Sequence, residues 1–515
     1  MNGHEILPYL IIIPLLGAFS MPIVNVIGRK AREAWAVIIS GATLAVGSAL
    51  FYYVWENKSI IVYTLGAKSP LGQGVNFPIR IVWEVDLFGA IMVLMVTLVS
   101  FLAVVYSIGY MKHDTGLDKY YTLIIILELG MLGIAITGDL FNFYVFLEIM
   151  SIASYALVAF RNDTWEGIEA GIKYMFVGSI ASSLVLLGIA LLYGQYGTLT
   201  MSYLAVKLAQ NPTVVGKVAL ALFIAGLLFK SGASPVHMWL ADAHPAAPSS
   251  ISAMLSGLVI KIGGIYALTR ILFSIYGHSV SMKTVGWVII IFACITLIVG
   301  NAMAVIQNDM KRLLAYSSVG QIGYILLGLG IGLAAYGSQT GEIAMAGAIY
   351  HTFNHALMKA LLFLIAGVVI HQLGTRDLNE LSGLAKTMPK TTFAFLIGAA
   401  AIIGMPPLNG FASKWLIYES SAIFNPILGA IAIIGTAFCT AAYVKVLYTF
   451  FGRPNERVLK ARDPEGSMLW PIIILTAAII IMGLFPWQIS DKVMIPAVKS
   501  LENQLAYISA VLGGA

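Results

Sequence analysis

The sequence has few charged residues and almost no cysteine. Only 10% of its 515 residues are Asp, Glu, Lys or Arg, whereas a soluble domain carries about 25%. The two cysteines, Cys294 and Cys439, lie in apolar runs, and there is no CxxC motif. The sequence therefore excludes a cysteine-based zinc site and a cysteine-held iron–sulfur cluster. We expect this chain to bind no cofactor and no metal.

The amino-terminal residues also lack the marks of a cleaved leader. MNGHEILPYL has neither a basic segment nor a small-residue cleavage site, so it predicts a retained first helix. The formal net charge of +6 comes from scattered lysines and arginines. It indicates no nucleic-acid partner.

Long apolar runs dominate the chain, because 59% of its residues are hydrophobic. About 20 apolar residues cross a bilayer as a helix. On this basis the sequence predicts an all-α, polytopic membrane protein with about fourteen transmembrane helices. They are expected near residues 5–28, 34–55, 86–110, 119–137, 139–160, 168–193, 214–234, 248–275, 284–306, 313–336, 342–371, 391–421, 424–451 and 468–489. The runs IIVYTLG and FPIRIVWEVD, within 56–84, are expected to form a hairpin, and the tail 491–511 an amphipathic helix.

The basic residues of the connecting segments predict the orientation in the cell membrane. With the amino terminus outside, 15 loop lysines and arginines, Lys311 among them, fall on the cytoplasmic side and nine on the other. Such an excess favours both termini outside.

Six lysines within the apolar runs form three pairs. Lys173 and Lys359 are 186 residues apart, while Lys230 and Lys414, and Lys261 and Lys445, are each 184 apart. A lysine in the membrane interior costs about 2.5–3.5 kcal/mol on insertion scales, so a recurring set indicates a function. The spacing predicts an internal repeat.

The expected helices give this repeat a direction. The paired lysines fall in helices 6, 7 and 8 and in helices 11, 12 and 13, an odd offset of five, which predicts two inverted five-helix units. Helices 7 and 12 are expected to be broken, at SGASP (231–235) and GMPPLNG (404–410), because proline removes a helix donor. The expected organisation is three helices at 1–118, repeats at 119–283 and 284–460, and a last helix with the tail at 461–515.

Glu148 is expected near the middle of the membrane, about nine residues into its helix. A lone buried carboxylate would be protonated, whereas one beside a lysine can ionise. Lys230 is the expected partner, and opening or closing this pair would move protons. The alternative is a static ion pair that orients two helices.

Four further residues extend the candidate proton path, and Lys414 ends it after the second break, with a structural ion pair as the alternative for Lys414. Lys261 lies mid-helix between two isoleucines, with snorkelling as the alternative. His351, His355 and Lys359 follow at i, i+4 and i+8, which puts them on one helix face. Histidines relay protons near neutral pH; packing is the alternative, and a metal site is disfavoured by the lysine.

Other polar residues have equally good structural explanations. Lys173 and Lys445 are expected near the cytoplasmic ends, where snorkelling explains them. Asp139 is expected to cap a helix, and Glu128 to be buried beside a neighbouring lysine or to function in transport. The remaining three, His237, Asp242 and His244, are expected in the cytoplasmic connection after helix 7. They are candidates for admitting protons, and a solvated loop explains them almost as well.

Five stretches resemble the antiporter-like subunits of Mrp-type Na⁺/H⁺ antiporters, respiratory complex I and membrane-bound hydrogenases. They are DLFNFYVFLEIMSIASYAL, FKSGASPVHMWLADAHPAAPSSISAMLSGLVIKIGG, NDMKRLLAYSSVGQIGY, HTFNHALMKALLFLIAG and GMPPLNGFASKWLIYES. The first and last look most like the Mrp D-type subunit. The resemblance implies that Glu148 and Lys230 act as a pair, that Lys261 and Lys359 are central relay sites, and that Lys414 is the terminal one.

The resemblance also implies a function and partners. We expect an ion-translocating subunit, moving H⁺ with Na⁺ exchange left open, that works with other membrane subunits in a large complex in the lipid bilayer. Whether that complex is an oxidoreductase is left open. The alternatives are a proton-pumping subunit of a complex I relative, a stand-alone transporter of an organic solute, a catalytic oxidoreductase subunit, and a scaffold without transport.

Overall fold

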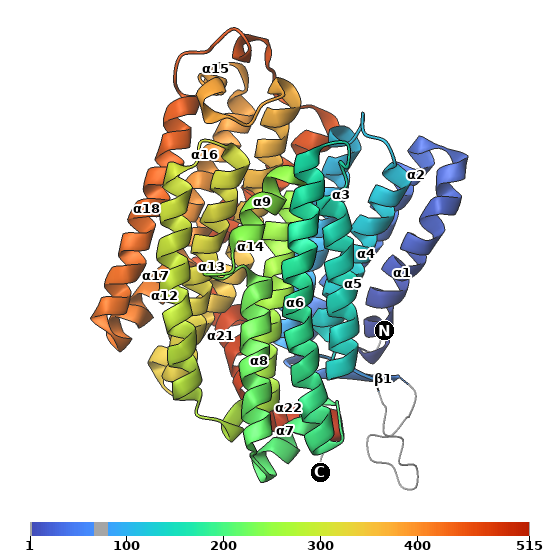
Figure 1. The fold of residues 1–515 in the computed structure, drawn as a ribbon, viewed down its shortest axis with the longest axis vertical. Helices are drawn as coiled ribbons and strands as arrows, with labels where there is room; N and C mark the ends of the chain where they lie inside the picture. The colour runs from blue at the N-terminus through green and yellow to red at the C-terminus, as the bar shows by residue number, and fades with distance from the viewer. Residues whose placement is uncertain (1–2, 66–80, 514–515) are drawn as a thin grey trace.

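The computed structural model describes residues 3–65 and 81–513 of the chain. Helices run side by side through the length of the molecule, and a two-stranded hairpin lies at one end (Figure 1). Thirteen helices in this described part are long and apolar enough to cross a membrane. The predicted all-α, polytopic class is therefore confirmed.

The bounds of the elements agree with most of the expected segments. Up to the first break they are α1 (Gly3–Ile27), α2 (Arg29–Asn57), β1 (Ile61–Leu65), β2 (Ile81–Val85), α3 (Leu87–Tyr110), α4 (Leu117–Ile136), α5 (Leu140–Val158), α6 (Trp165–Tyr196), α7 (Met201–Gln210) and α8 (Val214–Ser231). The central elements are α9 (Met238–Ala246), α10 (Ser249–Met254), η1 (Leu255–Val259), η2 (Lys261–Tyr266), α11 (Ala267–Arg270), η3 (Ile271–Tyr276), η4 (Gly277–Ser279), α12 (Met282–Ile306), α13 (Met310–Ala334) and α14 (Gln339–Leu373). The last are η5 (Leu378–Glu380), α15 (Leu384–Thr387), α16 (Pro389–Ile403), α17 (Asn409–Phe424), α18 (Pro426–Phe450), η6 (Val458–Lys460), η7 (Gly466–Met468), α19 (Leu469–Leu484), α20 (Pro486–Ile489), η8 (Ser490–Met494), α21 (Ile495–Glu502) and α22 (Gln504–Leu512).

Both predicted helix breaks are present. Helix α8 ends at Ser231 and α9 begins at Met238, and α16 ends at Ile403 before α17 begins at Asn409. Each first half ends on a glycine in the left-handed region, Gly232 at φ 72° and Gly404 at φ 96°. An L side chain there would be strained, so glycine permits the turn and the proline that follows prevents the helix from resuming.

The segment expected as one helix at 248–275 is irregular. It starts as α10, but η1, η2 and η3 are wider π-helical turns with only the short α11 between them. Wider turns shift the backbone hydrogen-bond pattern and often mark functional positions. All residues from Ser249 to Tyr276 except Arg270 are buried inside the bundle. The lipid-facing surface is therefore formed by other helices.

The hairpin and the carboxy-terminal helices meet at one end of the bundle. Strands β1 and β2 pair antiparallel from Ile61 opposite Val85 to Leu65 opposite Ile81, which confirms the expected hairpin; residues 77–80 of its second run lie outside the described part. Helices α21 and α22 follow the expected amphipathic tail and bury Val498, Leu501 and Tyr507 against the protein.

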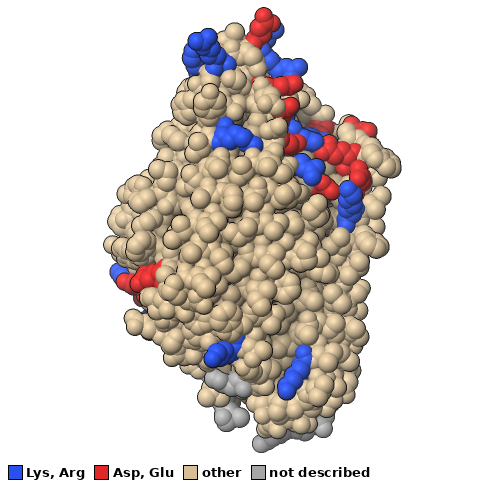
Figure 2. Space-filling model, turned by 60° about the vertical axis from the view of Figure 1, so that its left-hand side comes forward, with Lys and Arg blue, Asp and Glu red and all other residues tan. Residues whose placement is uncertain are grey.

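Charged side chains are concentrated at the opposite end. In Figure 2 most lysine, arginine, aspartate and glutamate side chains on the visible face lie near the top, above a broad uncharged surface. Helix α1 begins and α22 ends toward the other end (Figure 1). The uncharged surface fits lipid, because charged groups are expensive there.

Candidate proton-transfer site

Lys230 contacts the helix that carries Glu148. Its Nζ donates to Ser151 Oγ at 2.6 Å and to the Tyr155 hydroxyl at 3.2 Å. These acceptors lie three and seven residues after Glu148, on the same side of α5. Glu148 is close enough for its charge to act on Lys230, but its buried Oε1 has no hydrogen-bond partner among the described residues. The two groups are thus neighbours, with the ammonium turned toward the hydroxyls.

The end of α8 places Lys230 against the π-helical segment. Gly264 packs so closely on it that a Cβ there would lie 2.6 Å from the Cα of Ser231. After the break, the Ser234 backbone N–H donates to Thr296 Oγ1 at 3.0 Å. The glycine therefore brings the helix of Lys230 within one turn of Lys261.

Lys261 is fully buried, with no exposed surface. Its Nζ donates to the carbonyl of Ser256, which lies five residues earlier in the π-helical segment. A carbonyl oxygen has two lone pairs, so it can accept this bond beside a backbone bond. The mid-helix position that the sequence predicts is confirmed, and snorkelling to a surface is excluded by the burial.

Lys359 is also fully buried and has three acceptors. Its Nζ donates to the Leu314 carbonyl at 2.8 Å, to Ser317 Oγ, and to the Tyr443 hydroxyl at 3.1 Å. Helices α13 and α18 thus hold the ammonium of α14. A buried ammonium without such acceptors would be costly, which explains the hydroxyls that surround it.

A pair of serine hydroxyls lies between the two central lysines. The hydroxyls of Ser256 and Ser318 lie 2.7 Å apart, and Ser318 donates to the Leu314 carbonyl at 2.8 Å. Lys261 bonds the backbone carbonyl of Ser256, and Lys359 bonds the backbone carbonyl of Leu314, so the two ammonium groups lie at the two ends of this serine pair. The hydroxyls can accept and donate, whereas a carbonyl only accepts, so a proton crosses between the lysines where water joins the ammonium groups to the hydroxyls.

The two histidines differ in their contacts. His351 is held on both sides, with Nδ1 2.9 Å from Ser413 Oγ and Nε2 3.0 Å from Gln321 Oε1. His355 is fully buried, and neither ring nitrogen has a hydrogen-bond partner among the described residues. The two rings are parallel, with centroids 6.0 Å apart. His355 is close enough to the charges of Lys261, Lys359 and Lys414 to interact with all three.

Lys414 lies at the second break. Its Nζ donates to the carbonyl of Ile403, the last residue of α16, at 3.3 Å, and lies 4.4 Å from the ring centroid of Tyr324. The break frees that carbonyl, and a cation over an aromatic face gains about 0.5–2 kcal/mol. Its chain neighbour Ser413 contacts His351, so the terminal lysine joins the histidine end of the network.

Two of the six lysines lie outside this network, so the repeat contributes four buried ammonium groups. The Lys173 side chain is 48% exposed and forms ion pairs with Glu169 at 2.7 Å and Asp242 at 3.1 Å. Lys445 donates to the carbonyls of Val305 and Gln307 at the end of α12. Both lysines therefore fit the structural explanation given for them in the sequence analysis, a side chain that reaches the end of its helix.

Two further carboxylates have structural partners. Asp139 accepts from the backbone N–H groups of Phe141 and Asn142 at 2.9 Å, which confirms the predicted cap. Glu128 is fully buried, with Ser40 Oγ at 3.3 Å as its partner in place of the expected lysine.

The expectation that Lys311, His237 and His244 lie in solvated connections is wrong. Lys311 is buried at the start of α13 and donates to the carbonyl of Ala247 at 2.6 Å. His237 is buried as well, and His244 is fully buried with both ring nitrogens unpartnered in the described part. The cause is the second half of the broken helix, α9, which folds back into the bundle. A sequence pattern of apolar runs cannot show such a return.

The structure contains a second buried ionic cluster, which was not among the sites predicted from the sequence. Arg270 donates to both carboxylate oxygens of Asp86, and its Nη1 lies 2.8 Å from Asp86 Oδ2. Its Nε also donates to the Tyr266 hydroxyl at 2.9 Å. Glu84 lies beside this pair and is 5% exposed. Burial raises the pKa of the Glu84 carboxyl to about 8, although Arg270 and the facing Tyr507 hydroxyl counteract it. The only signal in the sequence is WEVD at the end of an apolar strand.

The raised pKa of Glu84 predicts how stability depends on pH. An unfolded glutamate ionises near 4.5 and this one near 8, so between these values the folded state binds the extra proton. The stability from this group is therefore complete below pH 4.5 and is lost as the pH rises to and through 8, by at most about 5 kcal/mol. Thermal unfolding measured from pH 5 to 8 should show a falling midpoint. Glu84→Gln should flatten this slope, and an equal slope in the variant would contradict the assignment.

Comparisons with known proteins agree with this architecture. A family model described as NADH:quinone oxidoreductase/Mrp antiporter, transmembrane, matches residues 137–440. A second, for the amino terminus of NADH-ubiquinone oxidoreductase (complex I) chain 5, matches residues 73–121. The first covers the network from Glu148 to Lys414.

Curated relatives match along nearly the whole chain. The N subunit of the NADH-quinone oxidoreductase of Desulforudis audaxviator is 34% identical, over 96% of this chain and 98% of the relative. The D-type subunit of the Na⁺/H⁺ antiporter of Alkalihalophilus pseudofirmus is 32% identical, over 98% and 99%. Hydrogenase-4 component B of Escherichia coli is 31% identical, over 89% of this chain and 70% of the relative.

Two solved complexes contain a chain of the same fold. A chain of the Mrp complex from Dietzia sp. DQ12-45-1b has a TM-score of 0.87 and 27% identity, with both chains fully covered. A chain of the membrane-bound sulfane sulfur reductase, an archaeal respiratory membrane complex, has a TM-score of 0.87 and 32% identity, over 99% of this chain and 100% of the other. This chain therefore belongs to the NADH:quinone oxidoreductase/Mrp antiporter family of membrane subunits.

Proposed function

We propose that this chain is the proton-translocating, antiporter-like subunit of a multi-subunit membrane complex. The observation that carries the proposal is the pair of fully buried lysines, Lys261 and Lys359, on either side of the Ser256 and Ser318 hydroxyls. Buried ionisable residues of this kind mark ion pathways in membrane proteins. The solved relatives of similar fold belong to an Mrp complex and a respiratory membrane complex, which supports the assembly with other subunits.

The path begins at Glu148 and Lys230. When Lys230 releases the hydroxyls of Ser151 and Tyr155 and moves to the unpartnered Glu148 oxygen, its positive charge moves along α5. That displacement changes the electrostatic field at Lys261, one helix turn from the end of α8. Protonation of one site is thereby coupled to the next.

The remaining transfers follow the buried network. Protons pass between Lys261 and Lys359 along the Ser256 and Ser318 hydroxyls and water that joins them to the two lysines, and reach Lys414 by His355 and His351. His355 fits a relay, because a neutral imidazole with two free nitrogens can accept a proton on one and release it from the other.

The repeat organisation and orientation belong to the same proposal. Two inverted units, 119–283 and 284–460, would each carry one helix break, and the breaks after Lys230 and before Lys414 support this division. Both termini lie outside the cell. The concentration of charged side chains at the other end of the bundle supports a cytoplasmic position for that end (Figure 2).

Lys230→Ala and Glu148→Ala are expected to abolish H⁺ flux in membrane vesicles that contain the assembled complex. Each removes one member of the starting pair, so the charge displacement is lost. Flux is followed with a pH-sensitive dye, and assembly by co-purification of the partner subunits.

Lys173→Ala is the matched control, because Lys173 is also a lysine of the repeat but forms surface ion pairs. It should retain flux close to that of the unaltered complex. Undiminished H⁺ and Na⁺ transport in the Lys230→Ala complex would refute the proposed function.

A further inference from the structure

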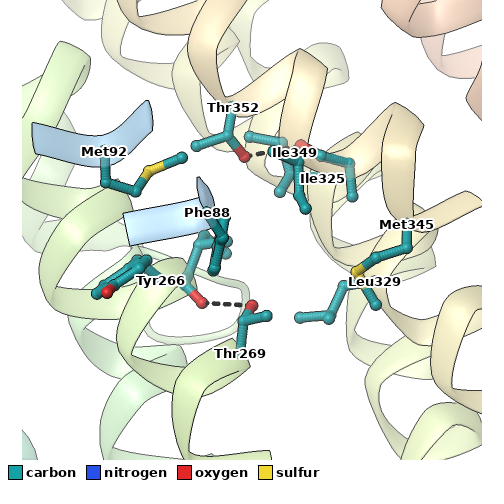
Figure 3. Close-up of a pocket in the computed structure, with 11 residues that line it drawn as sticks. Phe88, Met92, Tyr266, Thr269, Ile325, Leu329, Met345, Ile349 and Thr352 are labelled. Carbon is teal, nitrogen blue, oxygen red and sulfur yellow. Dashed lines mark hydrogen bonds between the residues drawn. The ribbon is translucent and has the colours of Figure 1, made fainter. Parts of the chain in front are cut away.

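A narrow cavity inside the bundle is too small to hold a ligand. It lies between α3, the 255–276 segment, α13 and α14 and has a volume of about 10 Å³, which is room for about one water molecule. Figure 3 shows it with the hydroxyls of Thr352 and Thr269 at two ends and apolar side chains between them. A larger molecule therefore needs an open groove on the surface.

Such a groove, of about 1020 Å³, lies at the charged end of the bundle. One wall is formed by the segment from η5 to α15, and the other by the last turns of α18 and the residues that follow it. In Figure 1, α15 lies close to the upper end of α18, at the edge of the bundle. The groove is therefore located where a spanning helix leaves the membrane.

Close backbone packing fixes the two walls to each other. The Gly383 N–H donates to the Thr449 carbonyl at 3.0 Å, and Ser382 Oγ donates to the Arg453 carbonyl at 2.8 Å. The φ of Gly383 is 88°, and a Cβ there would collide with the backbone nitrogen of Pro454, so only glycine fits. The groove is thus preformed, and a ligand can bind without first ordering it.

Two cations without a counter-ion line the groove. The side chains of Lys386 and Arg453 are exposed, and neither forms a hydrogen bond or an ion pair in the part of the chain that the structure describes. No described residue that lines the groove is acidic. Glu380, which follows the lining residue Asn379, is paired with Arg457 at 2.7 Å. The groove therefore attracts an anion.

The wall that α18 contributes is apolar and continues into the spanning segment. Val444, Tyr448 and Phe451 line the groove, all three are exposed, and Tyr448 is 83% exposed. Val444 and Tyr448 are four residues apart, on one side of the helix, and Phe451 follows directly after its end. Aromatic side chains are typical of the level at which a helix leaves the bilayer. The groove is thus cationic at its outer part and apolar toward the membrane interior.

A phospholipid fits both parts of the groove. A free phosphate ion would leave the apolar wall uncovered. An acidic segment of a partner subunit outside the bilayer would leave Val444 uncovered, because that residue lies within the spanning part of α18. An anionic headgroup with acyl chains attached covers the cations and the apolar wall together.

We propose that this groove is a binding site for one anionic phospholipid. The phosphate lies between Lys386 and Arg453, and the acyl chains lie along Val444 and Tyr448. Basic pockets beside spanning helices recognise anionic headgroups in this way. None of these residues belongs to the lysine network, so the site does not depend on the proposed function.

The test uses the assembled complex in detergent and a phosphatidylglycerol that carries a photoreactive acyl chain. After illumination, labelling of the peptide 444–453 is measured by mass spectrometry as a function of lipid concentration. In the double variant Lys386→Gln with Arg453→Gln, the concentration for half-maximal labelling should rise about twenty-five-fold, since each basic group near a membrane surface contributes about five-fold. Phosphatidylcholine with the same chains has no net charge and should label the unaltered groove many-fold less.

The matched control is the double variant Lys390→Gln with Lys460→Gln. These two lysines are exposed at the same end of the bundle but do not line the groove, so the control removes the same charge and should leave the half-maximal concentration nearly unchanged. Tyr448→Ser tests the apolar wall and should also weaken labelling. The comparison of the two lipids on the unaltered complex still decides the question if a variant fails to assemble.

Three results would overturn the lipid site. Equal weakening in both double variants, or equal labelling by the two lipids, would mean that the headgroup is not recognised in the groove. Complete displacement of the label by inorganic phosphate, with no effect of Tyr448→Ser, would show a simple anion site. An unlabelled groove that crosslinks to another subunit of the complex would show that a protein covers it. Transport by Lys230→Ala bears only on the proposed function, so the two can fail separately.

Discussion

Replacing Lys359 by alanine is expected to lower H⁺ translocation about a hundred-fold, the usual contribution of a positioned proton-transfer group. Lys359 is the residue at which the serine network, α14 and Tyr443 meet, and its Nζ reaches three acceptors. Without the ammonium, a proton at Lys261 has no acceptor at the other end of the Ser256–Ser318 connection. The measurement is dye-monitored flux in vesicles with the assembled complex.

Lys445→Ala is the control for this prediction. Lys445 is also a repeat lysine on a spanning helix, but it donates only to carbonyls at the end of α12. We expect it to keep most of its transport. Equal losses in both variants would mean that Lys359 acts only by holding helices together, and the relay role would fail.

The second large effect is on stability. Arg270→Ala is expected to destabilise the protein by about 3–5 kcal/mol, because it leaves the buried Asp86 carboxylate without its partner. The two side chains are only 11% and 5% exposed, so water cannot replace the lost contacts. Thermal unfolding of the purified complex in detergent measures the change.

A surface ion pair provides the matched comparison. Arg457 and Glu380 lie 2.7 Å apart with side chains 59% and 48% exposed, and exposed pairs contribute about 0–1 kcal/mol. Arg457→Ala should therefore shift the unfolding midpoint little. In the double variant Arg270→Leu with Asp86→Asn, much of the lost stability should return, since no unpaired charge remains. A midpoint as low as in Arg270→Ala would contradict this explanation.

Much of the candidate site could be predicted because charge in an apolar segment is conspicuous. Lys230, Lys261, Lys359 and Lys414 are each buried at the positions that the repeat indicates. The breaks at 231–235 and 404–410 could be predicted as well, since glycine and proline act on the local backbone. These features depend on neighbours in the sequence.

The partners of these residues could not be predicted in the same way. Lys230 turns toward Ser151 and Tyr155 instead of pairing directly with Glu148, and the contact depends on how α5 and α8 pack. Ser256 and Ser318 are ordinary serines in the sequence, and only the packing of the 249–276 segment on α13 makes them a connection. Hydroxyls carry no charge, so hydropathy does not reveal them.

The sequence alone was enough to identify a polytopic membrane protein with lysines inside its apolar segments and with two broken helices, because burying charge and stopping a helix are local energetic effects. The folded structure was needed to show that Lys173 and Lys445 lie outside the network, that Lys311 and His244 are buried, and that Glu84 lies beside Asp86 and Arg270. Each of these depends on contacts between segments distant in the chain, and apolar runs encode burial without specifying which helix faces which.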